Sequence, residues 1–149
     1  MARPAEYENL LRVGALKEAA RSDDSINQFL QCAQEMLAAS QANIGIAPTF
    51  TLAYEGMFNV VMAVLEFYGA RPGDTGGHRA TAIARVAADL GLASAKQSVL
   101  TRLHDVRNRV TYRKPLPPVT KADANAMQSI LNDMPSAANT LLGSHKGTT

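Results

Sequence analysis

The sequence predicts an all-α domain, and three observations lead to this class. Residues with high helix propensity, among them alanine, leucine, glutamine and arginine, dominate most of the chain. No convincing run alternates β-branched and polar residues as a strand would. Most of the seven prolines stand where apolar periodicity starts or stops, so they separate about five to six helical segments. With 149 residues and 46% hydrophobic content, we expect a single-domain bundle over residues 1–143 and a flexible tail at 144–149.

The first two predicted helices occupy the N-terminal part of the chain. Pro4 suits the first position of a helix that we expect to continue to Arg21. The run Ser-Asp-Asp-Ser at residues 22–25 then supplies N-cap side chains for a second helix that ends near Asn43. Residues 44–48 are expected to form a loop.

The third predicted helix, residues 49–68, is apolar nearly all round. This pattern indicates the central helix of a bundle or a helix at a subunit interface. Three polar residues fall on one side at steps of four and seven: Glu55, Asn59 and Glu66. This side is either an edge that faces solvent or one that points at the basic helix described below, where a glutamate paired with Arg107 would have a structural role.

Turn and capping residues bound the next two predicted helices. After a glycine-rich turn at 69–77, a fourth helix is expected over residues 78–90, closed by Gly91 in the left-handed conformation. The run Ser-Ala-Lys-Gln at 94–97 has the pattern of a capping box. It is expected to open a fifth helix that continues to about Tyr112.

A proline-rich break at 113–119 separates the last helix from the others. The run Thr-Lys-Ala-Asp at 120–123 is a second capping box, and Pro135 falls inside the helical pattern that follows. This helix is expected to fray after Leu142. Its inward side is expected to carry Ala126, Ile130 and Met134.

The candidate functional residues lie on the fifth predicted helix. Its apolar stripe recurs at steps of four, three and four: Val99, Leu103, Val106 and Val110. Two polar rows are expected on its free faces: His104, Asn108 and Tyr112 in one, and Arg107 and Thr111 in the other. An arginine and an asparagine beside a histidine suit a phosphate. The same residues are equally typical of a solvated helix face whose arginine pairs with a carboxylate.

The distribution of charge favours the phosphate interpretation. From Lys96 to Lys121, seven basic residues stand against the single acid Asp105, so this window carries a net charge of +6 while the whole chain carries +2. Such uneven charge is typical of a surface that meets phosphates. The overall pI of 8.9 is too mild to establish nucleic-acid binding by itself.

The sequence indicates neither a metal, nor a cofactor, nor a membrane segment. Its three histidines are far apart in sequence, without cysteines or acids at ligand spacing, and the glycines at 73–77 lack the lysine of a phosphate loop. The N-terminus lacks the apolar run of a signal peptide, and the longest apolar stretch, 58–65, is too short to span a bilayer. We therefore expect a cytoplasmic protein.

Three motifs in this chain resemble the HEPN superfamily of prokaryotic toxins, defence proteins and nucleotidyltransferase partners. They are Ala-Tyr-Glu-Gly-Met-Phe-Asn at 53–59, Gly-His-Arg at 77–79 and Arg-Asn-Arg-Val-Thr-Tyr at 107–112. The resemblance covers most of the chain, best from residue 49 to residue 142, and implies a HEPN-like bundle.

The third motif resembles the ribonuclease signature of that superfamily. The signature is an arginine, usually followed by a polar residue such as asparagine, with a histidine about five positions after the arginine. The resemblance implies that two copies meet in a homodimer, where the arginine binds the scissile phosphate and the histidine assists proton transfer without a metal. Arg107 and Asn108 match the signature, whereas Tyr112 stands at the histidine position.

This replacement puts catalysis in question. Tyrosine hydroxyls titrate at about pH 10 and imidazoles at about pH 6.5, so a tyrosine is a poor base near pH 7, and losing that assistance costs roughly 10² to 10⁴ in rate. His104, one turn before Arg107, is a candidate to take over the proton transfer. Tyr112 is alternatively a site of nucleotidylation, as tyrosines near this motif are in some members of the superfamily.

Two hypotheses therefore stand. The first is a metal-independent ribonuclease or RNA-binding effector of a toxin–antitoxin or antiviral system, a homodimer in which a shared basic cleft is lined by Arg107, Asn108, Tyr112 and His104. The second is a catalytically inactive HEPN-like interaction module that binds a partner protein or a nucleotide. The expected partners are a second copy, RNA, and an antitoxin, nucleotidyltransferase or other defence protein. The missing histidine favours the second hypothesis for chemistry and leaves RNA binding open.

Overall fold

Six helices and one short two-stranded sheet make up the described part of the computed structural model, which comprises residues 3–74 and 76–146. The chain forms a mostly helical single domain with 73% of its residues in helices, so the predicted fold class is confirmed. Side chains are described as far as residue 143.

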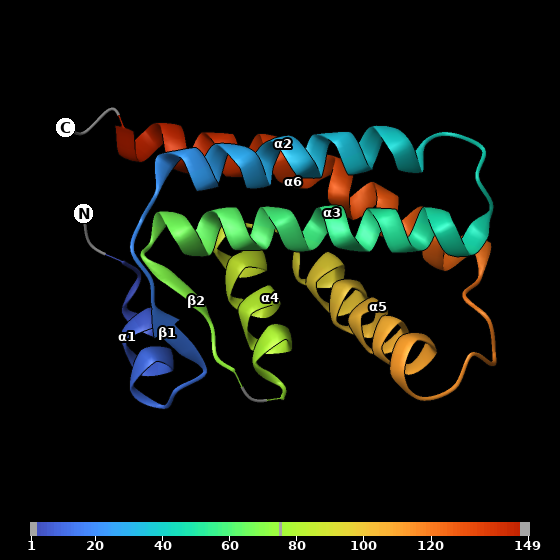
Figure 1. Ribbon diagram of the computed structural model, residues 1–149, viewed down its shortest axis with the longest axis horizontal. Coiled ribbons are helices and arrows are strands. Elements are labelled where there is room, and N and C mark those ends of the chain that lie inside the picture. The colour runs from blue at the N-terminus through green and yellow to red at the C-terminus, as the bar shows by residue number, and fades with distance from the viewer. Residues whose placement is uncertain (1–2, 75, 147–149) are drawn as a thin grey trace.

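Three long helices pack against one another: α2 (Asp23–Ser40), α3 (Ile46–Phe67) and α6 (Lys121–Lys146), with α6 behind the other two in the view of Figure 1. Helices α4 (His78–Asp89) and α5 (Ser94–Tyr112) pack on the other side of α3 (Figure 1). Helix α3 is therefore the central helix of the bundle, as its apolar sequence predicts.

Helix α3 is also long and apolar enough to cross a membrane by length and composition, with a mean hydropathy of 1.3. However, 61% of that window is buried inside the domain. A core helix of a soluble bundle has the same composition, because its surface faces other helices instead of water. Burial against α2, α4, α5 and α6 accounts for the apolar character of α3.

Gly56 lets the three long helices approach closely. A Cβ atom at this position would lie 2.7 Å from Leu131 Cδ2 on α6 and 3.2 Å from Met36 Cβ on α2. Both distances are shorter than normal carbon–carbon contacts. The missing side chain at Gly56 therefore lets the two neighbouring helices pack against this turn of α3.

The predicted first helix is too long. Helix α1 spans only Ala5–Arg12, because Gly14 adopts a left-handed conformation with φ of 81° and ends it. The chain then forms strand β1 (Leu16–Glu18), which pairs antiparallel with β2 (Ala70–Pro72). Strand β1 lies where the first helix was expected to continue, and β2 lies in the segment expected to be only a turn. Three residues per strand give too short an alternation for sequence periodicity to reveal.

Helix termini confirm some of the capping predictions. The hydroxyl of Ser22 accepts a hydrogen bond from the Ser25 amide at 3.2 Å and so caps α2. The hydroxyl of Thr120 accepts one from the Asp123 amide at 3.0 Å at the start of α6. Gly91 follows α4 in the left-handed conformation, with φ of 72°.

Other boundaries differ from those predicted. Ala93, not Ser94, precedes α5 as its N-cap, and no side chain caps this helix. The Gln97 amide group instead donates to the Leu92 carbonyl at 2.8 Å, so the expected capping box is wrong. Helix α3 begins three residues early, after Gly45. Gly45 has a φ of 103°, a backbone conformation that residues other than glycine rarely adopt.

The C-terminal helix continues past its predicted end near Leu142. The backbone is helical to Lys146. Residues 147–149 of the predicted tail lie outside the described part of the chain. Two of the three residues expected to point inward, Ile130 and Met134, are buried, and the third is partly buried against the core: Ala126.

Candidate functional site

The buried face of α5 is rotated from the one predicted. Leu103 is fully buried, but the three valines of the predicted stripe are only partly buried. Leu100 and His104 lie in the core instead. The prediction that His104 stands on an exposed patch is therefore wrong.

His104 occupies a hydrogen-bonded position inside the domain. Its side chain joins two neighbours, because Nδ1 lies 2.8 Å from the Tyr54 hydroxyl and Nε2 lies 3.1 Å from Asn108 Nδ2. An amide nitrogen can only donate, so Nε2 is the acceptor and Nδ1 carries the proton that is donated to Tyr54. This arrangement fixes one neutral tautomer of the imidazole.

The charges around His104 also favour the neutral imidazole. Burial lowers the pKa of His104 below its usual value. Asp105 opposes this shift, whereas the positive charges of Arg79 and Arg107 add to it. Because the usual pKa of histidine is about 6.5, His104 is uncharged near pH 7.

Arg107 is held by a carboxylate and two aromatic rings. Its Nη2 donates to Glu55 Oε1 at 3.2 Å, and its guanidinium lies 4.8 Å from the centre of the Tyr54 ring and 5.3 Å from that of Tyr112. A longer bond of 3.4 Å joins Nη1 to Asn108 Oδ1. The Arg107 side chain is only 15% exposed, so it is fixed in place before any ligand binds.

These bonds decide which polar residue of α3 faces α5. Glu55 alone follows the alternative that points at the basic helix, since it pairs with Arg107, whereas the Asn59 amide nitrogen lies 3.5 Å from Met36 Sδ on α2. Glu66 instead accepts a hydrogen bond from the Ser22 amide at 2.9 Å. The pair between Glu55 and Arg107 has the structural role expected of it, since it ties the central helix to α5.

A second arginine belongs to this cluster and is missed from sequence. Arg79 lies in the first turn of α4, and its guanidinium stacks 4.0 Å from the centre of the Phe58 ring. Burial raises the pKa of Tyr54, and the positive charge of Arg79 partly counters this rise. In the sequence, Arg79 stands out only as the last residue of the Gly-His-Arg motif, since nothing local shows that α4 brings it to α5.

Tyr112 remains at the surface, unlike the other three candidates. Its side chain is 70% exposed, and its hydroxyl forms no hydrogen bond within residues 3–74 and 76–146. The structure therefore brings Arg107, Asn108 and His104 into one hydrogen-bonded chain that ends at Tyr54. Tyr112 contacts this group only through its ring, which lies against the Arg107 guanidinium.

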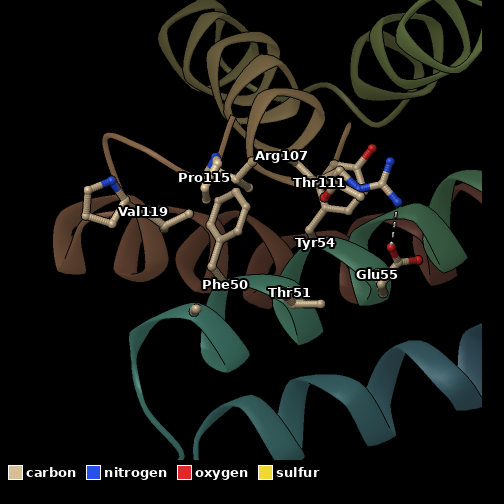
Figure 2. Close-up of a pocket in the computed structure, with 11 residues that line it drawn as sticks. Phe50, Thr51, Tyr54, Glu55, Arg107, Thr111, Pro115 and Val119 are labelled. Atoms are coloured by element: carbon tan, nitrogen blue, oxygen red, sulfur yellow. Dashed lines mark hydrogen bonds and ion pairs between the residues drawn. The ribbon is translucent and has the colours of Figure 1, made fainter. Parts of the chain in front are cut away.

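An open pocket of about 400 Å³ lies beside this cluster, between α3, α5 and the connection from α5 to α6 (Figure 2). The ion pair of Glu55 and Arg107 forms its polar side, where Figure 2 shows the two side chains pointing toward each other. The remaining lining is mostly apolar or aromatic: Ala47, Phe50, Thr51, Tyr54, Val110, Thr111, Pro115, Pro118 and Val119.

Much of the predicted positive charge is neutralised by other helices. Lys96 pairs with Asp133, Arg102 pairs with Asp123 at 2.9 Å, and Arg107 pairs with Glu55. With these three carboxylates counted, the net charge of +6 falls to +3. The other four cations of this window have no carboxylate partner among the described residues: Arg109, Arg113, Lys114 and Lys121. Each lies within two positions in sequence of a residue that lines the pocket.

No grouping of three metal-binding side chains occurs within the described residues. The sequence matches no protein-family model and no curated protein.

Proposed function

We propose that this chain is a cytoplasmic, HEPN-like RNA-binding component of a prokaryotic toxin–antitoxin or antiviral defence system. One observation supports it above the others, namely that residues lining a largely apolar pocket lie within two positions in sequence of cations that have no carboxylate partner among the described residues. Proteins that bind single-stranded RNA stack bases on aromatic side chains and hold the phosphates with lysine and arginine. Here the pocket would take a base, and Arg109, Arg113 and Lys114 would contact the backbone.

The proposed activity is binding without cleavage. A general base must reach the proton that it removes, within hydrogen-bond distance. His104 is only 5% exposed, and both of its ring nitrogens are engaged by neighbouring side chains. Its role is therefore to hold Tyr54 and Asn108 in place beneath the pocket.

The proposed assembly is a homodimer, in which two copies of α5 meet as the HEPN resemblance implies. Exposed apolar side chains at the end of α5 favour this arrangement, since Tyr112 and Leu116 would both be covered by a partner copy. Sedimentation at micromolar concentration measures the assembly directly. A stable monomer would exclude the shared cleft and leave the pocket of each copy as the binding site.

RNA binding is tested with a fluorescent oligouridine and two matched variants. Arg113→Gln should weaken binding and reduce the slope of log K against log salt by roughly 0.7, the value for one phosphate contact on a single strand. Arg12→Gln removes an exposed arginine from α1, which lies at the other end of the molecule from the α5–α6 connection (Figure 1). Neither arginine has a carboxylate partner within the described chain, and the Arg12 variant should bind as the wild type does.

The outcome also separates the two hypotheses. If the folded wild-type protein binds no RNA, the RNA-binding function is wrong and the interaction module is favoured. Equal losses in both variants would show a general effect of net charge instead of a site near the pocket.

A further inference from the structure

We propose that the pocket binds a guanine base of single-stranded RNA, and that Glu55 and Arg107 select guanine by contacting its Watson–Crick edge. This inference rests on the proposed RNA-binding function and names the base that the same site prefers.

The carboxylate of Glu55 has capacity left to accept hydrogen bonds. Its Oε1 accepts one bond from Arg107, while Oε2 has no partner in the described part of the chain. An ionised carboxylate offers about four acceptor positions. The Glu55 side chain is 37% exposed and lines the pocket, so a ligand can reach these positions.

Arg107 supplies a donor beside that acceptor. A guanidinium carries five N–H groups, and the contacts of Arg107 with Glu55 and Asn108 leave others available. The pair therefore presents an N–H donor next to a carboxylate acceptor on one side of the pocket. Because Arg107 is already held by this pair and by aromatic rings, little side-chain entropy is lost when a ligand binds.

Guanine is the base whose edge complements this pattern. It presents a carbonyl acceptor next to two adjacent N–H donors, which match the arginine and the carboxylate in that order. Adenine places an amino donor where the arginine donates and a ring acceptor where the carboxylate accepts, so both contacts would be unfavourable. Cytosine has the same conflict, and uracil offers only one N–H donor between two acceptors.

The rest of the pocket suits a purine ring. Phe50 and Tyr54 line it from α3 but are almost fully buried, with 1% and 0% of their surface exposed. The apolar surface that a base can contact therefore comes from the exposed Pro115 and Pro118 and the partly buried Val119. A volume of about 400 Å³ lies within the range of small-molecule sites, so it accommodates a purine together with part of its ribose. Lys114, which has no carboxylate partner in the part of the chain that the structure describes, directly precedes Pro115, where it can contact the adjacent phosphate.

The experiment measures binding of four fluorescent oligouridines of equal length, of which three carry one central guanine, adenine or inosine. The wild-type protein should bind the guanine oligonucleotide about 5- to 150-fold more tightly than the adenine one, the range for one bidentate base contact. Inosine lacks the exocyclic amino group and should fall between them.

Two charge-matched variants test the role of Glu55. Glu55→Gln replaces one acceptor oxygen by a donor, so the ratio of guanine to adenine affinity should fall to about one. Glu35→Gln removes the same charge from the exposed face of α2 and should keep the wild-type ratio. Thermal melts of both variants establish that the fold is intact.

Each result has one meaning. Equal affinity of the wild type for the guanine and adenine oligonucleotides, with oligouridine still bound, would overturn the guanine site and leave the RNA-binding function standing. An unchanged ratio in Glu55→Gln would also overturn it. Failure to bind any of the four would overturn both proposals together.

Discussion

Tyr54→Phe is the substitution that tests the buried hydrogen-bonded chain most directly. It removes only the hydroxyl that lies 2.8 Å from His104 Nδ1, and both side chains are in the core. With Asn108 donating to Nε2, the N–H at Nδ1 would lose its acceptor without gaining contact with water. A buried polar group left without a partner costs about 1–3 kcal/mol of unfolding free energy.

Tyr112→Phe is the matched control, because the same atom is removed from an exposed side chain with no hydrogen bond inside the described chain. Urea unfolding should place this variant within about 0.5 kcal/mol of the wild type. For a domain of this size, the Tyr54 variant should also melt lower by about 4 °C per kcal/mol. A Tyr54 variant as stable as the Tyr112 variant would refute the proposed role of the hydroxyl.

Two further predictions concern packing and pH. Gly56→Ala should lower the free energy of unfolding by about 1–3 kcal/mol relative to Gly143→Ala. An added Cβ would lie 2.7 Å from Leu131 Cδ2 at position 56, whereas at position 143 it would meet nothing within 4 Å. Equal unfolding free energies of the two variants would contradict the close approach of the helices at Gly56. The lowered pKa of His104 means that the unfolded chain takes up a proton first as pH falls, so stability should drop below about pH 6.5. Urea unfolding from pH 7.5 to pH 5 should show this drop in the wild type and a smaller one in His104→Gln, and parallel curves would exclude the histidine as the cause.

The helices with clear caps are the part of the fold that sequence predicts best. Ser22 and Gly91 act as expected because capping depends on residues close in sequence, whereas the capping box predicted for α5 is not formed. The end of α1 is missed because Gly14 is read as part of a longer helical pattern. Strands β1 and β2 are missed because their pairing depends on segments more than fifty residues apart.

The candidate site is predicted only in part, for a related reason. Arg107 and Asn108 are identified from their own helix, and the pairing of Glu55 with Arg107 is one of two alternatives that periodicity leaves open. The burial of His104 depends on how α5 is rotated against α3, which a histidine at the border of two faces does not decide. Arg79 reaches the cluster because α4 packs against α3 and α5, and the sequence around Arg79 contains no pattern that predicts this packing.

The prolines of the α5–α6 connection affect how readily the pocket is occupied. Pro115 and Pro118 have fixed backbone φ angles, and their rings have little rotational freedom to lose. A glycine-rich connection in the same place would sample many conformations and would have to be ordered by each incoming ligand. This wall instead keeps its shape when the pocket is empty, so binding and release should proceed without a slow loop closure, on the timescale of diffusion and steering by the neighbouring cations.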